Sequence, residues 1–167
     1  FSFFNQLSGD PPCVMYCPNS YKPGTEEHKD SLLNAEETGE FVYNICTADL
    51  LDQMVLTSKH SPRSLDEMAD VGLETATCEL VKPPRVKASP VSLECKYLQT
   101  VHLQRPGYRR FGSMVIGEIV GIHIADGAIT ADGLVDTSNL RPVKGQVTSF
   151  AALRSKVSVP SMLRIGT

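Results

Sequence analysis

The sequence predicts a mainly β domain of the α+β class, a small β-barrel with short helical insertions. Three observations lead to this prediction. Short helical patterns occur only in the first half of the chain, long β-branched segments follow after Glu74, and Pro, Gly or Asp-Gly turns separate these segments at short intervals. The 167 residues, 41% of them hydrophobic, suffice for one domain with its own core.

Two strands and three helices are expected in the first half of the chain. The strands are residues 12–17, a short apolar run after a Pro-Pro corner, and residues 40–46, where apolar and polar residues alternate. The helices cover residues 30–39, 47–58 and 64–72. The first two of these helices carry apolar residues at helical spacing, which predicts that one face of each is buried.

The ends of these helices have residues that are typical of caps. Asp30 or Ser31 is expected to begin the first helix, because short polar side chains can accept hydrogen bonds from the free N–H groups there. Gly39 is expected to end it, since glycine readily adopts a left-handed conformation. Ser64 and Glu67 have the spacing of a capping box at the start of the third helix.

Four strands are expected in the second half of the chain. They are residues 77–81, 91–98, 113–124 and 129–135. The third of these contains Gly117 and Gly121, where a long strand is expected to bend or bulge. Residues 144–167 differ from the rest, because they are rich in serine, basic and free of acidic residues, and they are expected to form a divergent tail.

The overall charge and hydropathy argue against two classes of partner. A net charge of −3 and a sequence pI near 5.8 provide no basic surface for nucleic acid. The longest apolar runs, such as residues 114–120, are broken by Gly and Glu, whereas a membrane span needs roughly 20 apolar residues. We therefore expect a cytoplasmic protein that binds neither nucleic acid nor a membrane.

The cysteines and histidines do not have the spacing of a metal site. The five cysteines include no CxxC pair, and the four histidines are far apart. Buried thiols that pack as small hydrophobic side chains are the simpler interpretation. No metal is therefore expected, and no GxSxG, P-loop or GxGxxG motif indicates another chemistry.

Five segments occur together in an order and approximate spacing that indicate a family. They are FSFFNQLSGDPP, HKDSLLNAEETGEFVYNI, LECKY, VIGEIVGIHI and LVDTSNLRPV, and they extend over residues 1–143. Each segment is a weak signal alone, but the five in sequence are specific. Together they resemble the flavin-reductase-like family of FMN-binding split barrels.

The resemblance implies a split β-barrel of Greek-key type, usually a homodimer, with FMN bound near the subunit interface. Members reduce flavin with NAD(P)H, pass electrons to a partner, or hold FMN. In such proteins FSFFN is an interior strand, so the resemblance also implies that the first strands of the barrel are missing before Phe1. The expected organisation is a domain at 1–143 that lacks these strands, followed by the divergent tail at 144–167.

By resemblance, two clusters are candidates for contact with the flavin. They are Ser2, Phe4, Asn5 and Ser8 in the first segment, and Lys29, Asp30, Ser31 and Asn34 at the start of the first helix. FMN needs cationic or N–H donors for its phosphate and a flat, partly apolar wall for its ring, and a helix start favours an anion. The alternative is that Phe3 and Phe4 are core residues, Ser8 caps a turn, and Lys-Asp-Ser is a solvated cap.

Further polar residues in the matching segments have two interpretations each. Asn44 is expected to be structural and to bond to the backbone, and Glu94 to be a half-buried strand residue paired with a basic neighbour. His123 would either approach flavin or nicotinamide or be a satisfied barrel histidine. Arg141 would either reach a phosphate or lie on the surface, and Cys95 would be a core residue or, less simply, a redox thiol.

The residues leave three functions open. The first is an FMN-binding oxidoreductase that transfers a hydride from NAD(P)H to flavin, so that its partners are flavin and a nicotinamide nucleotide. The second is an electron carrier that holds FMN without this turnover. The third is a non-catalytic module that acts through an interaction surface. No residue pattern distinguishes NADH from NADPH or identifies the final electron acceptor.

Overall fold

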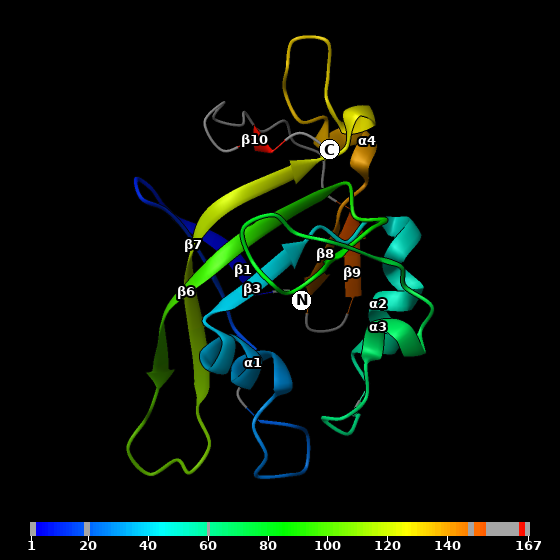
Figure 1. Cartoon of the computed structure of the whole chain (residues 1–167). Coiled ribbons are helices and arrows are strands. Elements are labelled where there is room, and N and C mark those ends of the chain that lie inside the picture. The colour runs from blue at the N-terminus through cyan, green and yellow to red at the C-terminus, as the bar shows by residue number, and fades with distance from the viewer. Residues whose placement is uncertain (1–2, 19–20, 60, 147–148, 153–163, 166–167) are drawn as a thin grey trace.

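The computed structural model describes residues 3–18, 21–59, 61–146, 149–152 and 164–165. Its centre is a curved sheet with the strand order β1-β2-β7-β6-β3, to which β10 adds by pairing with β7 (Figure 1). These strands are β1 (Phe4–Gly9), β2 (Pro12–Tyr16), β3 (Glu40–Asn44), β6 (Val91–Leu103), β7 (Gly112–Ile124) and β10 (Arg164–Ile165). The β10–β7 pair is parallel, and the other pairs are antiparallel.

Short elements surround this sheet. Two further strand pairs are β4 (Thr75–Ala76) with β5 (Arg85–Val86), and β8 (Val143–Gln146) with β9 (Ser149–Ala152). The helices are α1 (Asp30–Thr38), α2 (Leu51–Thr57), α3 (Glu67–Asp70) and α4 (Thr137–Leu140), with 3₁₀ turns η1 (Ala48–Leu50) and η2 (Asp126–Ala128). The predicted fold class, a mainly β domain with short helical insertions, is confirmed.

The sheet curls so that its two end strands meet through side chains. Phe4 of β1 stacks on Tyr43 of β3, with ring centroids 3.6 Å apart and ring planes 9° from parallel. These strands are at opposite ends of the strand order and are not hydrogen-bonded to each other. The result is an open barrel, closed at this point by an aromatic contact instead of a backbone ladder.

The core lies on the concave side of this sheet and between the sheet and α1. In β7, every second residue from Ser113 to Ile119 is buried, as a half-buried strand requires. The main cluster is built of Val14, Val91, Cys95, Ile119, Ile122, Ile124, Ala128 and Val135. A second cluster joins Leu32 and Ala35 of α1 to Val115 of β7. The helix therefore covers one part of the sheet with its apolar face.

The pairing of β6 with β7 is interrupted by two irregularities. The register with β7 shifts between Glu94 and Cys95 and again between Tyr97 and Gln99. The first shift leaves Val120 of β7 as the extra residue, and the second leaves Leu98 of β6. Glu94 and Cys95 therefore point to opposite faces of the sheet. Both are fully buried, because the main core covers Cys95 and the loop at 79–81 covers Glu94.

Two of the predicted strands are wrong. Residues 79–81 form a loop, since the N–H groups of Glu79, Leu80 and Val81 donate to the Glu94 carboxylate and not to a strand. Between Ile129 and Val135 there is only a single bridge, because Thr130 closes a turn by bonding to Leu134. Helix α4, which was not predicted, follows this turn and is capped by Asp136.

The helix ends agree with the prediction only in part. Gly39 ends α1 with φ of 71°, as expected. The residue that precedes α1 is Lys29, however, and neither Asp30 nor Ser31 caps the helix. Asp66, not Ser64, caps α3, because its carboxylate accepts from two N–H groups of the first turn.

Two further expectations concern hydropathy and the tail. None of the helices in the described part of the chain is long and apolar enough to cross a membrane. Within the predicted tail, backbone is described for 144–146, 149–152 and 164–165, where β8 continues and β9 and β10 lie. The other positions of the tail fall outside the described residues.

Candidate functional site

The N-terminus of α1 lacks a side-chain cap. Lys29 has an extended backbone and no side chain accepts from the first turn of the helix. The N–H groups of Leu32 and Leu33 both donate to the Lys29 carbonyl. The earlier N–H groups have no intrahelical acceptor, as at any helix start, and together with the helix dipole they favour an anion.

A buried lysine with two carboxylate partners lies next to this helix start. Lys22, which is 5% exposed, places its Nζ 3.1 Å from Asp30 Oδ2 and 3.6 Å from Glu27 Oε2. The other carboxylate oxygen, Asp30 Oδ1, is buried and has no hydrogen-bond partner. Burial, and after it the charge of Asp30, raise the pKa of Glu67 in α3. An unpaired buried acceptor is costly unless a donor reaches it.

The exposed side of α1 carries the remaining residues of the second predicted cluster. The side chains of Ser31 and Asn34 are both exposed, and they lie three positions apart on one helix face. Arg63 donates to Asn34 Oδ1 over 3.4 Å and forms an ion pair with Glu37. Sequence reasoning missed Arg63 and Lys22, because both belong to loops and have no motif around them.

The first predicted cluster is divided by the structure. Phe4 is half-buried in its stack on Tyr43, Asn5 is exposed, and Ser8 lies at the far end of β1. The Ser8 hydroxyl accepts from the Asp10 N–H, as a turn cap would. Ser2 lies outside the described residues. Phe3, which was expected in the core, is 48% exposed, because Phe4 points inward and neighbours in an extended chain alternate.

One contact joins the two predicted clusters. Phe4 pairs in register with Tyr16 of β2, and the Tyr16 hydroxyl donates to the Ser31 carbonyl over 2.7 Å. Burial raises the pKa of Tyr16, so this hydroxyl remains protonated and keeps its role as donor. The Phe4 and Asn5 end of β1 is therefore connected to the start of α1 through Tyr16, whereas Ser8 is not.

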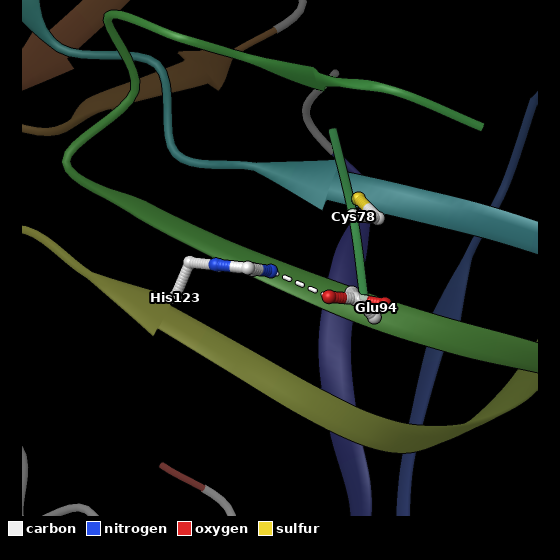
Figure 2. Close-up of side chains that lie close together, drawn as sticks. All are labelled: Cys78, Glu94 and His123. Atoms are coloured by element: carbon white, nitrogen blue, oxygen red, sulfur yellow. Dashed lines mark hydrogen bonds and ion pairs between the residues drawn. The ribbon is translucent and has the colours of Figure 1, made fainter. Parts of the chain in front are cut away.

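A second polar cluster lies around Glu94, on the face of the sheet opposite to the main core and under the loop at 79–81. Figure 2 shows His123, on β7, pointing at Glu94, on β6; their Nε2 and Oε1 atoms are 2.5 Å apart. The same Oε1 accepts from the Glu79 N–H, and Oε2 accepts from the N–H groups of Leu80 and Val81. With four donors, every lone-pair site of the carboxylate is used. Glu94 thus fastens the loop at 79–81 to the sheet.

The hydrogen bonds decide the ionisation of Glu94. Burial by itself raises the pKa of this carboxyl group, but the N–H of Glu79, the His123 ring and the N–H groups of Leu80 and Val81 outweigh it. Together they hold the pKa below its ordinary value. An ionised carboxylate can only accept, so His123 Nε2 is the donor. The prediction of a half-buried Glu94 with a basic neighbour is thus wrong on burial and right on pairing.

Cys78 completes a group of three metal-binding residue types. One ligand atom each of Cys78, Glu94 and His123 lies within 4.8 Å of the others (Figure 2). Burial and the Glu94 charge raise the pKa of the Cys78 thiol to about 11, whereas a metal ligand must be a thiolate. A metal would also have to displace a donor from the saturated carboxylate. The geometry therefore favours a structural role for this cluster.

The other polar residues singled out in the sequence have structural contacts. Asn44 Oδ1 accepts from the Val86 N–H and from the Ser92 hydroxyl, each over 2.9 Å, which confirms its bond to backbone. Arg141 lies on the surface, 3.7 Å from Asp49. Burial and the Glu94 charge raise the pKa of the Cys95 thiol to about 12, which leaves little thiolate for redox chemistry.

Comparison with known proteins identifies the family. The model of the flavin reductase like domain matches residues 1–144, which is most of the chain. This protein belongs to the flavin-reductase-like family, as the five segments predict. Its fold is accordingly the split barrel of that family, and the open curled sheet agrees with this.

Individual relatives agree with this assignment. An uncharacterized protein of Deinococcus radiodurans is 33% identical over 129 residues, which cover 77% of this chain and 53% of that protein. The chain thus spans about half the length of this relative. Nitrilotriacetate monooxygenase component B from Bacillus cereus has the same fold, with a TM-score of 0.81 at 24% identity over 95% of this chain and 77% of the other. Flavoredoxin of Desulfovibrio vulgaris matches with a TM-score of 0.73 at 19% identity over 95% and 79%.

Proposed function

We propose that this chain binds FMN at the start of α1 and takes part in hydride transfer from NAD(P)H to flavin. The uncapped start of α1, which Lys29 precedes, carries the proposal within a flavin-reductase-like domain. When bound, FMN supplies the redox chemistry, so the protein has only to bind and orient it. This explains why no nucleophile or metal is required of the chain.

Each residue has a distinct part in this proposal. The ammonium of Lys29 and the N–H groups of the first turn hold the phosphate, and the hydroxyl of Ser31 and the amide of Asn34 add further bonds. Asp30 faces Lys22 with one oxygen, and its buried, unpaired Oδ1 can accept from a hydroxyl of the ribityl chain. Phe4 contributes to an apolar wall with Asn5 beside it, and the roles of Ser2 and Ser8 stay predictions.

Retention of flavin tests the proposal directly. The purified chain is mixed with FMN, desalted, and scanned for the two visible absorbance bands of flavin; we expect them to remain. Lys29→Gln should weaken FMN binding about tenfold or more, because it removes a charged hydrogen bond to phosphate worth about 1.5–3 kcal/mol. Lys87→Gln is the matched control, since it removes an exposed lysine that is ion-paired with Glu74 and lies outside the proposed site.

Loss of all flavin on desalting, or equal affinity in the Lys29 and Lys87 variants, would refute the site. Anaerobic addition of NADH or NADPH to the loaded protein then separates the two remaining functions. Bleaching of the flavin bands supports the oxidoreductase. Retained flavin that neither nucleotide reduces supports the second candidate, an electron carrier that holds FMN.

We also propose that the chain forms a homodimer. Leu7 of β1 and Leu98 and Leu103 of β6 are each about half exposed, at 48%, 50% and 55%. Apolar side chains of this size gain free energy when a second copy covers them. Light scattering on the purified chain tests this, and a monomer at micromolar concentration would contradict it. The cytoplasmic location stays a prediction.

A further inference from the structure

The loop that joins β6 to β7 concentrates positive charge that the proposed flavin site does not use. It contains Arg105, Arg109 and Arg110 and no acidic residue, although the whole chain has a net charge of −3. The loop extends beyond the sheet at the bottom of Figure 1. Residues 104–109 and 111 line an open hollow of about 460 Å³.

The base of this loop is fixed against the segment that leads into α1. Arg110 donates to the Lys22 carbonyl over 3.1 Å and to the Thr25 carbonyl. The Phe111 ring packs edge-on against Tyr21, with centroids 5.8 Å apart. Because Lys22 also contacts Asp30 at the start of α1, the arginine loop lies next to the proposed flavin site.

The outer part of the loop presents two cations and an aromatic ring to solvent. Arg105 lies over the ring of Tyr108 at 4.8 Å, and Tyr108 is 62% exposed. Arg105 and Arg109 have no carboxylate partner among the residues that the structure describes. Guanidinium groups bind phosphate with paired N–H donors, and an exposed ring offers a surface on which a base can stack.

We propose that this loop binds the adenosine half of a nicotinamide dinucleotide, with Arg105 and Arg109 on its phosphates and Tyr108 against its adenine. The inference rests on the proposed function, which supplies the dinucleotide as electron donor. A dinucleotide carries its nicotinamide and its adenosine at opposite ends, so one molecule can occupy the flavin site and the loop together. The phosphate at the loop is either the pyrophosphate or the 2′-phosphate of NADPH.

Two ligands without nicotinamide test the loop separately from flavin reduction. Calorimetric titration of the chain with ADP-ribose and with 2′-phospho-ADP-ribose should show binding, and tighter binding of the second identifies the 2′-phosphate as the loop's ligand. Replacing both arginines, Arg105→Gln with Arg109→Gln, should weaken binding about tenfold for each guanidinium. The matched control is Lys82→Gln with Lys87→Gln, which removes two exposed charges elsewhere and should leave the affinity unchanged.

The outcomes separate this proposal from that of the flavin site. Absence of binding by both ligands, or equal affinity in the arginine and lysine double variants, overturns it. A changed oligomeric state with unchanged affinity in the arginine variant would instead make the loop an interface between copies, which also overturns it. If the chain does not retain FMN but binds either ligand through the arginines, the flavin proposal fails and the loop proposal stands.

Discussion

Glu94→Ala is expected to lower the free energy of unfolding by about 3–5 kcal/mol, because each buried donor left without its acceptor costs about 1–3 kcal/mol. The substitution leaves His123 and three backbone N–H groups without their acceptor under the loop at 79–81. The loop at 79–81 also loses its attachment to the sheet. Urea denaturation followed by circular dichroism measures the loss.

Glu74→Ala provides the matched control. Glu74 is a glutamate too, and its partner is Lys87. Its side chain is 74% exposed, however, and exposed ion pairs contribute little to stability. We expect this variant to unfold close to the midpoint of the unchanged chain. A Glu94→Ala variant as stable as Glu74→Ala would show that the buried carboxylate is dispensable.

The same carboxylate should make the fold sensitive to acid. Its pKa in the folded chain lies below the ordinary value of 4.5, so at neutral pH it is ionised in both the folded and the unfolded states. Its stabilisation is present above pH 4.5 and is lost as the pH falls towards the folded pKa, because the unfolded chain binds the proton first. Glu94→Gln should therefore show a smaller drop in Tm between pH 6 and pH 3.5, roughly the range in which a carboxylate titrates. Parallel curves for both proteins would contradict this.

Gly117→Ala is the second substitution with a large expected effect. A Cβ at this position would lie 2.4 Å from Cε1 of Phe41 and 2.8 Å from the backbone oxygen of Lys96. The oxygen belongs to the neighbouring strand β6 and can move only if the sheet moves with it. Overpacking of this kind costs about 1–3 kcal/mol and occasionally more, and we expect the upper end here.

Gly127→Ala is the control for this prediction, because an added Cβ there meets no atom within 4 Å and the residue has no positive φ. Urea midpoints of the two alanine variants provide the comparison. A second variant, Gly117→Ala with Phe41→Leu, removes the aromatic clash and leaves the one with the oxygen. We expect this double variant to regain part of the stability that Gly117→Ala loses. If Gly117→Ala alone were as stable as the unchanged chain, the two strands would separate easily at this point.

The sequence predicts the regular elements well where a period is uninterrupted. Residues 113–124 alternate and are enriched in β-branched side chains, and the observed strand is Gly112–Ile124. Gly39 ends α1 because its left-handed conformation is a local property. The strand expected at 77–81 failed, since the acceptor of its N–H groups is a side chain from a distant strand, which no local pattern reveals.

The same holds for the candidate site residues: those that are close in the sequence could be predicted, and those that meet only in the fold could not. Lys29, Ser31 and Asn34 could be proposed from the sequence because they surround one predicted helix start, which the structure places at Asp30. The burial of Glu94 was missed because it depends on the loop at 79–81 and on His123, which no residue in LECKY indicates. Lys22 meets Asp30, and Arg63 meets Asn34, only through the tertiary fold. The position of Arg105 over Tyr108 depends on the conformation of their loop. Only the structure therefore identifies these contacts.

The strand order also has a consequence for the way the chain is made. Strands β1 and β2 are neighbours in sequence and can pair as soon as both have left the ribosome. The other side of β2 pairs with β7, where Cys13 faces Glu118, so it must wait until most of the chain has been synthesised. Until then it is an open strand edge, which other chains can join. Nascent chains that stop before Gly112 are therefore the form of this protein most exposed to aggregation.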